Sequence, residues 1–193
     1  MTFLETYALV PVVLVGATSL VLLFYPNWRW TLMAVMVQYL AAAWLVSLSW
    51  PVGLAAVKLV VGWMAGAVLS TIQEAEEGHS EVFSGRLFRL IVAALLLVVV
   101  FTLPSNMQTW LQVSRPVFWG GLILSGMGLL QVSMTSNALR IVLGLLTFLA
   151  GFEVLYAGLE FSVLVAGLMA AVNLGLALAG TYLLSAPEQK ETE

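Results

Sequence analysis

Seven apolar stretches, separated by short polar or turn-forming segments, account for most of the chain. Each holds about 20 residues, which is the length a helix needs to cross the hydrocarbon core of a bilayer. None of them alternates apolar and polar positions with a period of two, so we expect α-helices and not a β-barrel. The stretches lie near residues 6–25, 31–49, 52–73, 87–104, 115–133, 138–158 and 161–184.

Proline, asparagine and glycine mark several of the connections. Pro26 and Asn27 follow the first stretch, Pro51 follows the second, and Gly158 lies between the last two. These residues end helices or form tight turns. We therefore expect the helices that these turns join to be antiparallel neighbours in an all-α, polytopic membrane protein.

Composition agrees with this class of protein. Of the 193 residues, 62% are hydrophobic and only 9% are charged, and the mean hydropathy is +1.04. Such values lie outside the usage of soluble domains. The chain has no cysteine, which excludes thiolate metal and iron–sulfur sites. Its net charge of −3 and lack of a basic tract argue against nucleic acid as a partner.

The few cations predict an orientation. If the N-terminus is outside, only Arg115 lies on the outer side of the membrane. Cations are enriched in inner loops, so we expect the N-terminus outside and the C-terminus inside. The cations on the inner side are then Arg29, Arg86, Arg89, Arg140 and Lys190.

An internal similarity predicts how the helices are grouped. The segment "AAVNLGLALAGTYLLS" (170–185) resembles "AAVKLVVGWMAGAVLS" (55–70) at a constant offset of 115 residues. At the same offset, Glu153 aligns with Gln38 and Asn173 aligns with Lys58. We expect two parallel three-helix repeats joined by one extra helix, which residues 87–104 supply. The alternative is a chance match between helices rich in alanine, valine and leucine.

These observations divide the chain into four regions. Residues 1–73 form the first repeat, 74–114 an acidic loop with the bridging helix and a connecting loop, 115–185 the second repeat, and 186–193 a polar tail. The segment "QEAEEGHSE" (73–81) contains four glutamates and the only histidine. A lone histidine beside flexible carboxylates indicates a solvated loop more than a cation site, so we expect no bound metal.

Polar residues inside the apolar stretches are the candidate functional groups. Glu153 and Lys58 stand at membrane depth, where an ionised side chain costs about 2.5–3.5 kcal/mol on insertion scales. Glu153 either handles a proton or cation in a polar cavity, or is a protonated carboxyl bonded to a neighbouring helix. Lys58 either takes part in transfer or pairs with an acid on another chain. Asn173 and Gln38 are typical of helix-packing contacts, and we expect Glu160 at the water interface.

The patterns of known catalytic sites are missing from the sequence. There is no Ser/His/Asp set, no pair of acids with metal-ligand spacing and no Gly-rich phosphate loop. We therefore expect no catalysis by this chain alone and no cofactor.

One segment resembles a known family. "GGLILSGMGLLQVSMTSNALRIVLGLLTFLAGFEVLYA" (120–157) is similar to the first two helices of the small K-type membrane subunit of respiratory complex I and of multisubunit cation/proton antiporters. With "NWRWTLMAVMVQYLAAAWLV" (27–46) and "AAVKLVVG" (55–62), the whole chain resembles the E-type membrane subunit of hydrogenase-4 more closely. The buried glutamate of the K-type helix corresponds to Glu153.

The resemblance implies a non-catalytic subunit of an ion-translocating, complex I-like or group 4 hydrogenase-like assembly in the plasma membrane of a prokaryote. Its partners would be other membrane subunits. K-type subunits carry a second buried acid in the following helix, and Asn173 stands near that position here. Proton transfer through this subunit would then need Glu160 or an acid of a neighbouring chain. Two other hypotheses remain: a structural assembly subunit without a transport role, and a small stand-alone secondary transporter.

Overall fold

The computed structural model describes residues 7–25, 27–71, 83–103 and 113–185. Every regular element in these ranges is an α-helix, as predicted. There are seven helices: α2 (Leu9–Phe24), α3 (Trp28–Ser47), α4 (Val52–Leu69), α5 (Phe83–Thr102), α7 (Arg115–Ser133), α8 (Ala138–Leu159) and α9 (Val163–Ser185).

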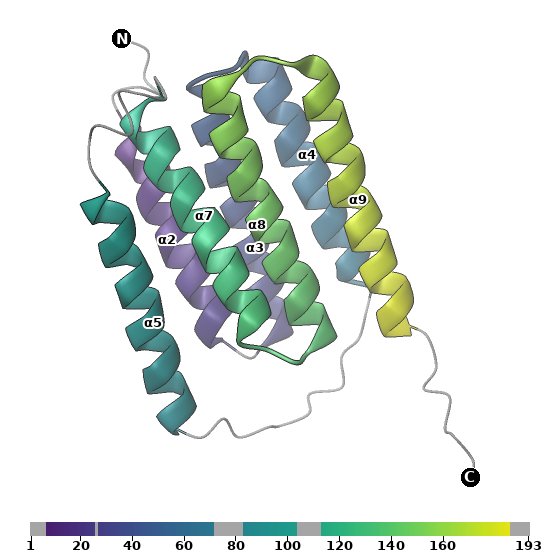
Figure 1. Ribbon diagram of the computed structural model, residues 1–193. Helices are drawn as coiled ribbons and strands as arrows, with labels where there is room; N and C mark the ends of the chain where they lie inside the picture. The colour runs from purple at the N-terminus through teal and green to yellow at the C-terminus, as the bar shows by residue number, and fades with distance from the viewer. Residues whose placement is uncertain (1–6, 26, 72–82, 104–112, 186–193) are drawn as a thin grey trace.

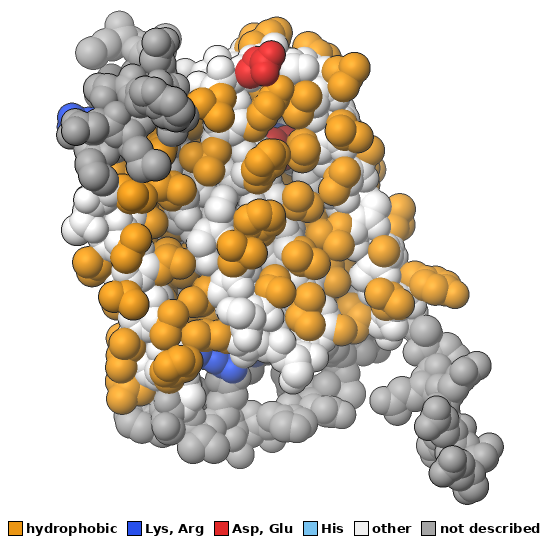
Figure 2. Space-filling model, viewed as in Figure 1, with side chains coloured by type: hydrophobic (Ala, Val, Ile, Leu, Met, Phe, Trp, Pro, Cys, Tyr) orange, Lys and Arg blue, Asp and Glu red, His pale blue; other side chains and the backbone are white. Residues whose placement is uncertain are grey.

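Five of the seven helices are long and apolar enough to cross a membrane. These are α3, α4, α7, α8 and α9, while α2 and the apolar part of α5 (Leu87–Thr102) are shorter. Figure 2 shows hydrophobic side chains over most of the visible face between the two ends of the molecule. Both features are consistent with a multi-pass membrane protein.

The predicted helix positions are confirmed, and their ends differ by a few residues. α3 begins at Trp28, three residues before the predicted start, because the Asn27 side chain accepts a hydrogen bond from the backbone N–H of Arg29. α4 ends at Leu69, and the following residue, Ser70, donates its hydroxyl to the Ala67 carbonyl. Hydropathy alone cannot locate these caps, because it registers apolar character and not backbone hydrogen bonding.

Helices α3 and α8 lie at the centre of the bundle (Figure 1). α3 packs against α2, α4 and α8, and α8 packs against α7 and α9. α4 and α9 lie side by side at one edge, and α5 stands at the opposite edge beside α7. The central position of α3 and α8 places their polar residues in the interior.

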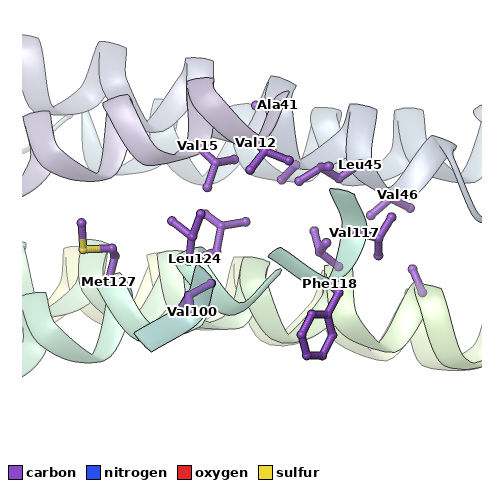
Figure 3. Packing of buried hydrophobic residues seen from close by; sticks show 14 of the residues in the cluster. Val12, Val15, Ala41, Leu45, Val46, Val100, Val117, Phe118, Leu124 and Met127 are labelled. Atoms are coloured by element: carbon purple, nitrogen blue, oxygen red, sulfur yellow. The ribbon is translucent and has the colours of Figure 1, made fainter. Parts of the chain in front are cut away.

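Apolar side chains fill the space between α2, α3 and α7 (Figure 3). Val15, Leu45 and Leu124 are completely buried within this cluster. Their packing holds α2 and α3 against α7.

Glycines allow α7 and α8 to approach closely. A Cβ atom at Gly128 would lie 2.7 Å from the carbonyl oxygen of Gly144, and one at Gly121 would lie 3.3 Å from that of Gly151. The two glycines on each helix are seven residues apart, so both pairs fall on one antiparallel seam. Small residues commonly mediate such contacts between membrane helices. The seam sets the register of α8 and therefore the depth of Glu153.

Parts of the sequence interpretation lie outside the described residues. These are the whole acidic segment 73–81 with its histidine, and the polar tail 186–193 with Lys190. The side chain of Arg86 is also outside the described part of α5. The solvated loop and the cation count on the inner side stay predictions.

Candidate functional site: a buried ion pair between α4 and α8

Lys58 on α4 and Glu153 on α8 form an ion pair in the interior of the bundle. The Lys58 ammonium contacts one carboxylate oxygen of Glu153, and the two side chains are only 3% and 7% exposed. The sequence left open whether Lys58 pairs with an acid of another chain. In the structure its partner is Glu153 of the same chain, so each charge compensates the other in a core that is otherwise largely apolar.

A contact between two turns brings the two charges to the same depth. Trp50, before α4, donates its indole N–H to the carbonyl of Glu160, which follows α8, at 3.1 Å. Its ring also makes edge contacts with Tyr156 and Phe161. Lys58 is eight residues after Trp50, and Glu153 is seven residues before Glu160. At about 1.5 Å per helical residue, both lie about 10–12 Å from this contact.

Tyr39 on α3 connects the ion pair to Asn173 on α9. The Lys58 nitrogen lies 5.3 Å from the centre of the Tyr39 ring, within the range of a cation–π interaction. The Tyr39 hydroxyl donates to the Asn173 side-chain oxygen at 3.0 Å. The Asn173 amide in turn donates to the Met169 carbonyl at 2.9 Å. Four helices thus contribute side chains to one polar cluster, which we call the ion-pair cluster: Tyr39, Lys58, Glu153 and Asn173.

A small cavity adjoins the ion-pair cluster. All four of its residues line this cavity, together with apolar side chains of α4 and α9. About 10 Å³ of it is open to the centre of a water-sized sphere. That is about the minimum space for one water molecule, which also needs two to four polar partners. The lining supplies such partners, so the cavity is suited to a water that contacts the ion pair.

Gln38 belongs to a second polar group one residue away along α3. Its amide donates to the Ser19 hydroxyl on α2 at 3.2 Å, and its carbonyl oxygen lies 3.5 Å from the Thr147 hydroxyl on α8. Thr147 also donates to the Leu143 carbonyl at 2.8 Å. Gln38 therefore connects three helices, which is the packing role that its residue type indicated.

The five residues selected from the sequence fall into three places. Glu153 and Lys58 are in direct contact, and Asn173 joins them through Tyr39. Gln38 lies in the neighbouring polar group. Glu160 is exposed at the end of α8 and takes part through its backbone only. The described residues contain no group of three or more His, Cys, Asp or Glu side chains that could hold a metal.

Tyr39 is the residue that the sequence interpretation missed. It is 2% exposed and stands in the middle of α3. Tyrosine is enriched at membrane interfaces, where its hydroxyl reaches water. A tyrosine far from either end of a span, directly after a buried glutamine, was therefore the signal that could have identified it.

The bundle and its buried charges define a class of protein: a helical bundle of membrane-protein type with an ion pair in its core. Comparison of the chain with protein-family models, with curated proteins and with solved structures finds no match.

Replacing Tyr39 by phenylalanine should destabilise the protein by about 1 kcal/mol, because Asn173 then loses the hydroxyl that hydrogen bonds to its side-chain oxygen. The midpoint of unfolding in an SDS titration, followed by circular dichroism, measures this change. Tyr182→Phe is the matched control, since Tyr182 is 76% exposed on α9. Equal midpoints for the two variants would contradict the role of Tyr39.

Proposed function

We propose that this protein is a non-catalytic integral subunit of an ion-translocating membrane complex, in which Glu153 paired with Lys58 handles a proton. The observation that carries the proposal is the buried ion pair next to a cavity with room for one water molecule. Ionisable groups within membrane spans usually mark ion pathways. A buried salt bridge is in itself weak evidence for stability, because desolvation offsets much of the attraction.

The pair can take up and pass on a proton in a defined way. A proton that reaches the Glu153 carboxylate neutralises it and leaves the Lys58 ammonium without its counter-ion. The ammonium, held beside the Tyr39 ring, then favours departure of a proton from the cluster, which restores the ion pair. A water in the cavity would contact both groups and could relay that proton.

In this proposal all seven helices cross the membrane, and α2–α4 and α7–α9 are parallel repeats joined by α5. Three contacts support the symmetry: α2 packs against α7, α3 against α8 and α4 against α9. The central helix of each half also begins with an asparagine cap, Asn27 in one and Asn137 in the other. The protein would lie in the plasma membrane of a prokaryote, with its N-terminus outside.

The resemblance to the E-type membrane subunit of hydrogenase-4 suggests a complex I-like or group 4 hydrogenase-like assembly. Its other membrane subunits would be the partners. Asn173 cannot carry a proton as an acid would, and its amide contacts Tyr39 and Met169. We therefore expect the proton to reach or leave Glu153 through a neighbouring subunit.

Copurification tests whether the chain belongs to a complex. An epitope-tagged chain, extracted from its own cells in mild detergent, should elute as a large assembly with other membrane proteins. Elution as a single chain that moves protons after reconstitution alone into liposomes would instead identify a stand-alone transporter.

Glu153→Gln should lower coupled proton movement about tenfold or more, since a positioned proton-transfer group commonly contributes at least this factor. Proton uptake by membrane vesicles, normalised to assembled complex, measures the effect. The exchanged variant, Lys58→Glu with Glu153→Lys, keeps an ion pair but moves the carboxylate to α4. Full proton movement in Glu153→Gln, with the complex assembled, would reject the proton role. Full movement in the exchanged variant would show only that the carboxylate need not stand on α8.

A structural assembly subunit is the second candidate, and the ion pair favours it because Lys58 and Glu153 join the two halves of the chain. In that case Glu153→Leu would abolish the complex, while Glu153→Gln and the exchanged variant would assemble and support normal proton movement.

A further inference from the structure

A second cavity lies at the end of the bundle where the turns from α2 to α3 and from α7 to α8 are found. About 20 Å³ of it is open to the centre of a water-sized sphere. This is room for one or two oxygen atoms. Its polar lining consists of Thr31, Arg89, Gln131, Thr135 and Arg140, so five elements or turns contribute to it.

Gln131 on α7 is the first sign of a ligand. The residue is 6% exposed, and its side-chain nitrogen is buried without a hydrogen-bond partner among the described residues. A buried amide donor without an acceptor destabilises a protein, and a leucine would fill the same volume without that loss. The side chain lines the cavity, so an acceptor atom placed there would satisfy it.

Two guanidinium groups from different helices line the same cavity. Arg89 on α5 donates to the Met134 carbonyl at 3.3 Å, and Arg140 on α8 lies 3.5 Å from the Tyr25 carbonyl. These contacts fix both arginines beside the ends of α7 and α2. The acidic side chains in the described part of the chain are Glu153 and Glu160, which lie in the last third of α8 and just after it. The described residues that line the cavity include these two cations and no acid, and both cations have further contacts besides the two carbonyls.

We propose that this cavity binds a phosphate group, either that of an anionic phospholipid or free phosphate. One phosphate oxygen would enter the cavity and accept from the Gln131 amide, and the others would face the two guanidinium groups. Arginine suits this role because its planar donors match phosphate oxygens. Basic pockets between membrane helices are known to hold lipid headgroups. The site is separate from the ion-pair cluster, so it does not depend on the proton role of Glu153.

Thermal unfolding of the full chain in mild detergent tests the proposal. The probes are phosphatidylglycerol, phosphatidylcholine and inorganic phosphate, each at the same ionic strength. A ligand that binds only the folded protein raises the unfolding midpoint, and the stabilisation grows with the logarithm of the ligand concentration divided by Kd. We expect phosphatidylglycerol to raise the midpoint and phosphatidylcholine to leave it unchanged. A rise with inorganic phosphate as well would show that the phosphate group is sufficient, whereas a rise with the lipid alone would show that the acyl chains are needed.

Two variants and one control identify the residues involved. Gln131→Leu should fold at least as stably as wild type without lipid, and Arg140→Gln removes one guanidinium. Each should weaken the apparent affinity for the phosphate ligand about tenfold, the effect of losing one charge-assisted hydrogen bond. Arg115→Gln, at the opposite end of α7, should leave the affinity unchanged.

Three results would overturn the proposal. One is the absence of any rise with phosphatidylglycerol and with phosphate. Another is a rise that Gln131→Leu and Arg140→Gln leave intact, or that Arg115→Gln reduces equally. The third result combines two observations. Replacing the glutamates of segment 73–81 by glutamine lowers the unfolding midpoint of the protein without ligand, and no phosphate ligand raises the midpoint of the wild type or of this variant. This result would assign the arginines to the chain's own acidic segment.

Discussion

Lys58→Met is expected to destabilise the protein by about 3–5 kcal/mol, because it leaves the Glu153 carboxylate buried without its counter-ion. Methionine has nearly the length of lysine and an adaptable shape, so the loss of packing is small. Protonation of Glu153 can recover part of the loss, since a neutral carboxyl is more easily buried than an anion. The midpoint of unfolding in SDS, measured for the purified chain, reports the change.

The double variant, Lys58→Met with Glu153→Met, is the control for Lys58→Met alone. Removing both charges abolishes the desolvation of both, and replacement of a buried pair by apolar residues is often neutral or stabilising. We expect the double variant to be far more stable than Lys58→Met alone. Additive losses from the two single changes would show that the groups do not interact.

The same double variant separates stability from function. If it folds and assembles but the complex no longer moves protons, the pair is retained for proton handling and not for stability. If it folds, assembles and moves protons normally, the pair serves only to join α4 and α8.

The helices could be predicted from the sequence because each is a predominantly apolar stretch, and length and hydropathy are local properties. The contact between Lys58 and Glu153 could not be predicted in the same way. It depends on the register of α4 against α8, which the Trp50 to Glu160 hydrogen bond fixes. The acceptor of that bond is a backbone carbonyl, which every residue has, so the bond cannot be predicted from the residue types. Tyr39 was missed for a related reason, since its hydroxyl acts through a partner on α9.

The spacing of the seam glycines can be read from the sequence, but the contact that they form between α7 and α8 cannot. Gly121 and Gly128 are seven residues apart, as are Gly144 and Gly151. Spacing alone shows that each helix has a groove on one face. That the two grooves face each other follows only from the antiparallel packing of α7 and α8, which places Gly128 opposite Gly144.

Gly128→Leu should therefore destabilise the protein by about 3 kcal/mol or more, at or above the upper end of overpacking effects. A Cβ atom at this position would lie 2.4 Å from the backbone nitrogen of Phe148 and 2.7 Å from the Gly144 carbonyl oxygen. Backbone atoms of a helix cannot move aside as a flexible side chain can, so α7 and α8 must separate. The unfolding midpoint in SDS measures the loss.

Gly175→Leu on α9 is the matched control, because no described atom lies within 4 Å of a Cβ atom there. It should be neutral or slightly stabilising, since leucine favours a helix more than glycine does. Separation of α7 from α8 also shifts Glu153 relative to Lys58, so Gly128→Leu should reduce proton movement even where the complex assembles. Similar unfolding midpoints for the two glycine variants would mean that the seam does not hold α8 in place, and the depth of Glu153 would then need another cause.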